Sequence, residues 1–262
     1  MKARKRFGQH FLEAAWVTKL VNAIEPVATD RFIEIGPGRG AITMPLAPRV
    51  KQIVAVEVDR DLAADLAARA LPNVRVETAD VLDVDLGAIA RELGAARVVG
   101  NLPYNISSPI LFRLLETAAT TGLLRDATLM LQKEVADRLI AKPGTSEYGV
   151  LSLSTALGAD VRTLLALPPG AFRPAPKVRS AVVRLTFRPP PPEVRHPKLI
   201  IEIVRAVFTQ RRKMLSNALA PFATSRGVSA PEALTTAGLD PRRRPETLTL
   251  LDVARLADVL AR

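Results

Sequence analysis

The first 150 residues alternate short apolar runs with amphipathic segments, and this alternation limits the possible folds more than any other feature of the chain. Parallel strands need a long crossover between them, usually a helix, so strands that alternate with helices indicate an α/β domain. We therefore expect a mainly parallel sheet with helices on both faces. The expected strands are residues 31–36, 52–58, 74–78, 96–100 and 127–131, and the expected helices are 41–49, 62–71, 109–117 and 133–140.

A proline run at residues 188–192 divides the chain. Proline lacks the amide proton and stiffens the backbone, so this run predicts a linker. The sequence therefore predicts an α/β domain over residues 1–188, which begins with a basic leader at residues 1–12, and a small helical domain over residues 189–262. The remaining expected elements are strands at 148–157 and 181–187 and helices at 198–209, 212–220, 231–237 and 251–260.

Basic residues concentrate in two parts of the chain. Residues 171–262 carry 17 Lys and Arg against 7 Asp and Glu, whereas residues 1–170 carry 20 against 19. This asymmetry favours a polyanion such as nucleic acid as the partner, although each basic cluster could also be plain solvated surface. The residues expected to contact RNA phosphates are Lys5, Arg6, Arg211, Arg212, Lys213, Arg242, Arg243 and Arg244.

The composition argues against several classes of site. The chain has no cysteine, which excludes disulfides, thiolate metal ligands and cysteine nucleophiles. His10 and His196 lie far apart in the sequence, so we expect no metal site. No apolar run approaches the ~18 residues that span a bilayer, and the basic leader is not followed by the apolar stretch of a signal peptide. We expect a cytoplasmic protein.

A glycine-rich turn, Glu-Ile-Gly-Pro-Gly-Arg-Gly at residues 34–40, follows the first expected strand. Gly36 and Gly38 allow a ligand to approach the backbone closely, and ligands of open α/β sheets bind at the carboxyl ends of the strands. The third glycine comes one residue too early for the G-x-G-x-x-G fingerprint of nicotinamide dinucleotides. The turn therefore favours a different nucleoside cofactor.

Acidic residues end the next two strands. Glu57 ends the second strand, at the place where an acid can accept hydrogen bonds from ribose hydroxyls. Asp80 follows the third strand and could accept a hydrogen bond from an adenine amino group. Either residue alone could be a solvated strand end. Three successive strand ends that carry polar ligands together predict a nucleoside cofactor.

The motif Asn101-Leu102-Pro103-Tyr104 follows the fourth strand and is the most specific feature of the sequence. An adenine N6 amine is a poor nucleophile because its lone pair is delocalised into the ring. The Asn101 side-chain oxygen and the carbonyl of Leu102 or Pro103 could accept the two amine protons, and Tyr104 could stack on an extruded base. Catalysis would rest on positioning rather than on a strong base. The motif predicts adenine-N6 methylation of either DNA or RNA.

Seven segments of the chain, in order, resemble motifs of the KsgA/RsmA family of small-subunit (16S) ribosomal RNA adenine dimethyltransferases. This resemblance extends nearly from end to end. It implies a Rossmann-like class I methyltransferase sheet with helices on both faces, followed by a small C-terminal all-helical domain. The resembling segments are residues 6–12, 34–43, 101–107, 131–136, 148–152, 169–180 and 208–213.

The resemblance also implies a cofactor, a substrate and roles for individual positions. S-adenosylmethionine would methylate two adjacent adenines near the 3′ end of 16S rRNA to N6,N6-dimethyladenosine, in an immature small ribosomal subunit. We expect a monomeric enzyme without a metal. Phe172 is expected to pack against the target base, opposite the Asn101–Tyr104 motif. The expected cofactor contacts are His10, Leu12, Gly36, Gly38, Glu57, Asp80 and Asn101.

Two alternatives remain open. One is an enzyme of the macrolide-resistance type, which methylates an adenine of 23S rRNA; the end-to-end resemblance and Leu102 within the catalytic motif favour the small-subunit enzyme. The other is a non-catalytic RNA-binding assembly factor, against which the intact catalytic motif and the complete set of acids argue.

Overall fold

The structure is a computed structural model that describes residues 11–261, and these residues form two compact units. In the described range, the first unit comprises residues 11–136 and 160–188, and the second comprises residues 137–159 and 189–261. The first unit thus ends at residue 188, where the sequence places the domain boundary. Residues 137–159, which were expected to lie in the α/β domain, belong to the second unit.

A seven-stranded sheet forms the centre of the first unit, in the order β4-β3-β2-β5-β6-β9-β7. Neighbouring strands from β4 to β6 are parallel, and β9 is antiparallel to β6. The expected mainly parallel sheet is confirmed. From β2 the chain adds strands first on one side, through β3 and β4, and then on the other, through β5 and β6. Sheets of this kind bind ligands at the point between β2 and β5 where the strand order reverses. The strands are β2 (Arg31–Ile35), β3 (Gln52–Glu57), β4 (Val74–Thr78), β5 (Ala96–Asn101), β6 (Leu124–Gln132), β7 (Ala159–Leu167) and β9 (Ser180–Phe187).

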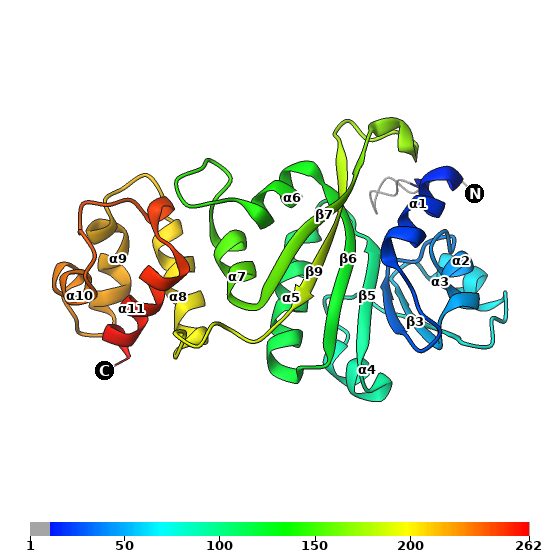
Figure 1. Cartoon of the computed structure of the whole chain (residues 1–262), viewed down its shortest axis with the longest axis horizontal. Helices are drawn as coiled ribbons and strands as arrows, with labels where there is room; N and C mark the ends of the chain where they lie inside the picture. The colour runs from blue at the N-terminus through cyan, green and yellow to red at the C-terminus, as the bar shows by residue number, and fades with distance from the viewer. Residues whose placement is uncertain (1–10, 262) are drawn as a thin grey trace. The chain divides into compact units, whose positions relative to one another are not determined.

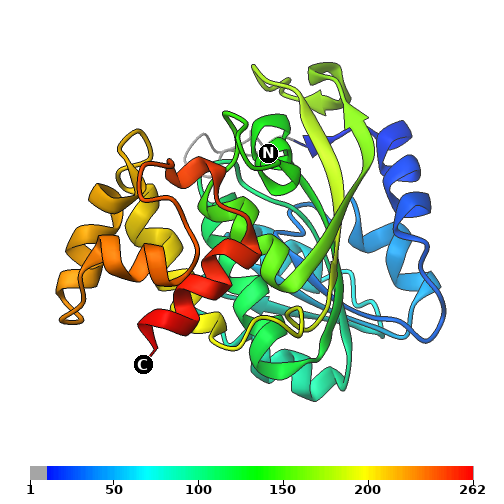
Figure 2. The ribbon, with the colours of Figure 1, turned by 60° about the vertical axis from the view of Figure 1, so that its left-hand side comes forward.

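Helices cover both faces of this sheet, as expected. Figures 1 and 2 show α1 and α2 on one face and α4 and α5 on the other. A small antiparallel pair joins β1 (Phe11–Leu12) to β8 (Phe172–Arg173). The helices are α1 (Ala14–Ile24), α2 (Thr43–Leu46), α3 (Arg60–Ala67), α4 (Leu86–Leu93), α5 (Ser107–Thr121) and α6 (Lys133–Ile140), with 3-10 turns η2 (Ala47–Arg49) and η3 (Pro169–Ala171).

Arg97 of β5 is a buried cation that ties the sheet to α1. It forms ion pairs with Asp30 at 2.8 Å and Asp126 at 3.0 Å. Its Nη2 also donates to the Ile24 carbonyl at 2.7 Å. The last carbonyls of a helix have no partner within the helix, so Arg97 satisfies a group that burial would otherwise leave unpaired.

Arg184 of β9 makes a second tie to the same helix end. Its guanidinium donates to the Ile24 carbonyl at 3.0 Å and to Glu25 Oε2 at 2.8 Å. Two arginines from different strands therefore hold the carboxyl end of α1 against the sheet.

The second unit is helical, and the expected helices that follow the proline run are confirmed. Figure 2 shows them from α8 in yellow to α11 in red. Their apolar faces, together with Tyr148, Leu153 and Leu157, form one hydrophobic core. The helices are α7 (Val150–Gly158), α8 (Pro197–Phe208), α9 (Leu215–Thr224), α10 (Ala230–Thr236) and α11 (Leu250–Leu260), with the 3-10 turn η4 (Pro245–Thr247).

The expected strand at residues 148–157 is wrong, because most of this segment forms helix α7. Leucine and serine alternate over residues 151–154, which resembles the period of a strand. In the helix, Leu153 and Leu157 lie one turn apart and both enter the core of the unit. Ser152 Oγ accepts a hydrogen bond from the Gly149 amide at 3.2 Å and donates to the Arg138 carbonyl at 2.6 Å. These hydrogen bonds satisfy a buried hydroxyl at the start of the helix.

Candidate active site

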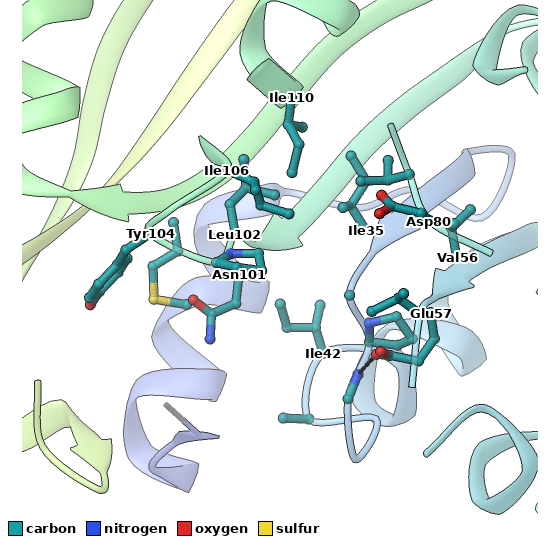
Figure 3. Close-up of a pocket in the computed structure, with 18 of the residues that line it drawn as sticks. Ile35, Ile42, Val56, Glu57, Asp80, Asn101, Leu102, Tyr104, Ile106 and Ile110 are labelled. Carbon is teal, nitrogen blue, oxygen red and sulfur yellow. Dashed lines mark hydrogen bonds between the residues drawn. The ribbon is translucent and has the colours of Figure 1, made fainter. Parts of the chain in front are cut away.

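A cavity of about 270 Å³ lies in the first unit, at the carboxyl edge of the parallel strands. Figure 3 shows Asn101 and Tyr104 on one side of it and Glu57 and Asp80 on the other. The lining residues are Leu12, Ile35, Gly36, Pro37, Gly38, Ala41, Ile42, Val56, Glu57, Val58, Ala79, Asp80, Val81, Asn101, Leu102, Pro103, Tyr104, Asn105, Ile106, Ile110 and Met130.

Two glycines bring the two sides of this cavity close together. Gly36 has a φ of 65°, in the left-handed region that glycine adopts without strain. Gly100 lies where β5 passes β2, and a Cβ there would lie 2.7 Å from the Ile35 carbonyl oxygen. Any larger residue at position 100 would separate the two strand ends. The close approach sets Asn101 beside the glycine turn.

Glu57 holds the glycine turn from the neighbouring strand. Its side chain is buried, and Oε2 accepts a hydrogen bond from the Gly38 amide at 2.9 Å. Oε1 accepts one from the Asp59 amide, also at 2.9 Å. Asp59 in turn caps the first turn of α3. The Glu57 carboxylate therefore joins the turn to the beginning of the next helix.

Asp80 follows β4 and is half-buried at the cavity wall. Its Oδ1 accepts a hydrogen bond from the Leu82 amide at 2.9 Å. Neither Asp80 nor Glu57 forms an ion pair with any residue of the described range 11–261. Both carboxylates thus keep lone pairs for a ligand at the cavity.

Glu34 lies behind the turn, with 1% of its surface exposed. Neither carboxylate oxygen has a hydrogen-bond partner within residues 11–261, and the nearby Thr43 hydroxyl also has none there. Burial raises the pKa of Glu34 to about 7. The side-chain hydroxyl and the backbone amide of Thr43 offset part of this rise, and the negative charge of Glu57 adds to it. Sequence reasoning had assigned Glu34 no role of its own.

The Asn101–Tyr104 motif begins at the last residue of β5. Asn101 pairs with Met130 of β6, and the Leu102 amide donates to the Met130 carbonyl at 3.2 Å. Leu102 is buried, which anchors the loop, whereas Asn101, Pro103 and Tyr104 are partly exposed at the cavity. The sheet thus fixes the start of the loop, and its polar and aromatic side chains remain accessible.

The cavity brings together most of the residues that were expected to act at one site: Leu12, Gly36, Gly38, Glu57, Asp80 and Asn101–Tyr104. His10, Lys5 and Arg6 lie outside the described residues.

The resemblance implies that Phe172 packs against the target base. Its side chain is fully buried, and it does not line the cavity. Phe172 pairs with Leu12 through the β1–β8 bridge and packs in the core with Trp16 and Ile24. An aromatic position in a motif does not reveal whether the ring faces a core or a ligand.

The cavity also has apolar walls that sequence reasoning missed. Val58 is 46% exposed beside Glu57, and Val81 follows Asp80. Their position next to the strand-end acids was the available signal, because a base or nucleoside needs an apolar surface for its ring as well as acceptors for its polar edge.

The six basic residues expected in the second unit fall into two groups. Arg211 donates to Glu246 at 2.9 Å and to the Ser146 carbonyl at 2.6 Å, and Arg243 donates to Asp252 at 2.9 Å. These two arginines hold loops of their own unit. Arg242, which also pairs with Asp240, has a highly exposed side chain, and the other exposed members are Arg212, Lys213 and Arg244.

Residues 11–261 contain no helix long and apolar enough to cross a membrane. In the same range, no three acidic or histidine side chains are grouped as a metal site would need.

Comparisons with known proteins agree on the family to which the chain is similar. The family model described as "Ribosomal RNA adenine dimethylase" matches residues 1–261. A relative from Nitrosococcus oceani, named "Ribosomal RNA small subunit methyltransferase A", is 45% identical over 97% of this chain and 95% of its own length. A relative of the same name from Leptothrix cholodnii is 48% identical over 85% of this chain and 81% of its own length.

Solved structures share the fold over nearly the whole chain. A dimethyladenosine transferase from Plasmodium falciparum matches with a TM-score of 0.76 and 23% identity, over 94% of this chain and 96% of its own. The 23S rRNA methyltransferase ErmE matches with a TM-score of 0.67 and 26% identity, over 96% and 100%. The chain belongs to the ribosomal RNA adenine dimethylase family, and it is an rRNA methyltransferase that uses S-adenosylmethionine.

Proposed function

We propose that this enzyme transfers methyl groups to N6 of two adjacent adenines near the 3′ end of 16S rRNA, giving N6,N6-dimethyladenosine in an immature small subunit in the cytoplasm. The observation that carries the proposal is that the Asn101–Tyr104 motif and the acids Glu57 and Asp80 line one cavity. The relatives named as small-subunit enzymes are 44–48% identical, whereas the 23S enzyme is 26% identical. This difference favours the small-subunit RNA.

The cavity suits S-adenosylmethionine. Glu57 and Asp80 offer acceptors to ribose hydroxyls and to the adenine amine, and Val58 and Val81 offer apolar surface to the adenine ring. Two carboxylates without basic partners among the described residues favour a cation. The bound cofactor supplies a methyl group that is attached to a positively charged sulfur, and this sulfur is a good leaving group.

Asn101 would act on the target base. Its side-chain oxygen and the Leu102 or Pro103 carbonyl accept hydrogen bonds from the N6 amine and direct the nitrogen lone pair into the cavity. The Tyr104 ring stacks on the extruded base, which contributes roughly 1–3 kcal/mol. Attack on the methyl group leaves a positive charge on N6, which then loses one proton to water, so the loop needs to position the amine rather than deprotonate it before the transfer.

The exposed basic residues of the second unit would bind RNA phosphates. Arg212, Lys213, Arg242 and Arg244 are exposed. Phosphate contacts set affinity without reading sequence, so they make binding steeply dependent on salt. Arg211 and Arg243 contribute mainly by holding the loops that carry these side chains.

Methylation assays with Asn101→Ala test the proposed function. The variant should lose roughly 10²- to 10³-fold in kcat, as expected when an oriented acceptor or donor is removed from an active site, while its affinity for small-subunit particles stays within about twofold. Asn22→Ala, at an exposed position of α1, is the matched control and should remain fully active. Near wild-type turnover by Asn101→Ala would disprove the role of Asn101.

The substrate assignment is tested by offering wild-type enzyme both small-subunit particles and 23S rRNA, with mass spectrometry of the products. We expect dimethyladenosine in 16S rRNA alone. Labelling of 23S rRNA alone would support the macrolide-resistance type, and binding without any methylation would support the assembly factor.

A further inference from the structure

Ser180 lies next to the catalytic loop although it is 76 residues further along the chain. Its Oγ is 2.8 Å from the Tyr104 hydroxyl. Ser180 is the first residue of β9 and pairs with Gln132 of β6, the strand that also pairs with Asn101. A hydrogen bond therefore links the far end of the Tyr104 ring to the central sheet.

Ser180 is only 2% exposed, so its hydroxyl needs a partner within the protein. Within residues 11–261, Tyr104 supplies that hydrogen bond. Tyr104 is also held at its backbone, because Ser107 Oγ donates to its carbonyl at 3.2 Å. The residue is thus held at both ends, while part of its ring remains at the cavity.

A tyrosine ring can rotate about two side-chain bonds. The hydrogen bond at its hydroxyl limits rotation about the Cα–Cβ bond and so fixes where the ring lies, whereas the hydroxyl oxygen lies on the axis of the second rotation. Burial raises the pKa of Tyr104 above its ordinary value, and the hydrogen bond to Ser180 offsets part of this rise. The hydroxyl therefore remains protonated at neutral pH, and the bond to Ser180 does not depend on the charge state of the ring.

We propose that Ser180 is a positioning residue for methyl transfer, which holds the Tyr104 ring in the place where it stacks on the extruded adenine. The inference rests on the proposed function, because it takes an RNA adenine as the base. Ser180 itself contacts neither the base nor the methyl donor. Its effect passes entirely through the Tyr104 hydroxyl.

A double-mutant cycle with Ser180→Ala, Tyr104→Phe and the combined variant tests this coupling. Each single change should lower kcat roughly three- to tenfold, the range expected for one hydrogen bond, with the KM for RNA changed by less than twofold. The combined variant should be no slower than the slower single variant, because both changes remove the same bond. Ser180→Thr keeps the hydroxyl and should recover most of the lost turnover.

Two readouts separate positioning from general damage to the fold. S-adenosylmethionine affinity, measured by calorimetry, should stay within about twofold in all variants, since Ser180 does not line the cavity. Ser154→Ala is the matched control, because Ser154 is also a buried serine but lies in α7 of the second unit. It should leave kcat unchanged.

Multiplying losses in the combined variant, or wild-type kcat in Ser180→Ala, would overturn the proposal. Failure of the proposed function has a different signature, since wild-type enzyme would then methylate an RNA other than 16S. The same cycle measured on that RNA would still test the coupling of Ser180 to Tyr104.

Discussion

At the amino-terminal edge of the central sheet, Arg97 forms ion pairs with both Asp30 and Asp126, and all three side chains are buried. At the carboxyl edge, the hydrogen bonds that Glu57 and Asp80 receive from residues 11–261 come from backbone amides. The same sheet thus holds paired charge at one edge and, at the other, acids that have no basic partner among residues 11–261.

This difference suggests that the amino edge serves the stability of the fold and that the carboxyl edge serves its function. Removing one partner of a buried ion pair leaves the other charge buried and unpaired, which is strongly destabilising. The ion pairs at the amino edge therefore serve the stability of the fold. The carboxyl edge leaves negative charge available to a cationic, hydroxyl-bearing ligand. Changes at the amino edge should therefore lower the free energy of unfolding, and changes at the carboxyl edge should impair binding or turnover in a protein that remains folded.

The largest expected effect comes from Arg97→Met. This change leaves Asp30 and Asp126 buried without their cation and frees the end of α1, so the free energy of unfolding should fall by about 3–5 kcal/mol. Denaturant titration measures the loss. The matched control is Arg188→Met, which breaks the more exposed pair with Asp160 and should cost less than about 1 kcal/mol. Equal losses in both variants would remove the distinction between the buried cluster and an ordinary ion pair.

The second prediction concerns pH and Glu34. Its folded-state pKa of about 7 lies above the ordinary value of 4.5, so the folded protein holds this proton more tightly than the unfolded chain does. The stabilisation is complete below pH 4.5 and is lost as the pH rises to about 7. The loss amounts to about 3 kcal/mol.

Glu34→Gln removes this titration, because the amide stays neutral. Unfolding free energies of wild type and Glu34→Gln, measured from pH 4 to pH 8, should diverge in favour of the variant as the pH rises. A constant difference between the two proteins over this range would show that the pKa of Glu34 is the same in the folded and unfolded states.

The smallest of these effects is expected for Glu57→Gln. Its side-chain oxygen can accept from either the Gly38 or the Asp59 amide but not from both, and the cavity loses a negative charge. The Kd for S-adenosylmethionine should rise roughly tenfold, with less loss of stability than in Arg97→Met. Calorimetry measures the Kd, and Glu92→Gln, at an exposed position, is the control. Unchanged affinity would exclude Glu57 as a cofactor contact.

The sequence predicted the carboxyl edge well because its signals are local. The glycine turn, Glu57, Asp80 and Asn101 each stand directly after an apolar strand, and parallel strands bring such positions to one edge. Helix α4 also had local signals, the cap residue Asp85 and Gly94 at its end, but was not predicted.

The amino edge and the Tyr104 contact could not be predicted in the same way. Helix α1 is preceded by Glu13, whose side chain does not cap it, and its end is held by Arg97 and Arg184 from distant strands. Ser180 lies 76 residues from its partner. Such partners depend on how the strands are ordered in the sheet, which no local pattern specifies.

The role of the carboxyl edge, with Asn101 at its centre, in dimethylating 16S rRNA can be tested in cells. Mass spectrometry of 16S rRNA from a strain that lacks the gene tests it most directly, with wild type and Asn101→Ala each returned on a plasmid. We predict that dimethyladenosine near the 3′ end disappears in the deletion strain, returns with wild type and stays absent with Asn101→Ala. Persistence of dimethyladenosine in the deletion strain would show that another enzyme makes it, and its return with Asn101→Ala would show that Asn101 is not needed for methyl transfer.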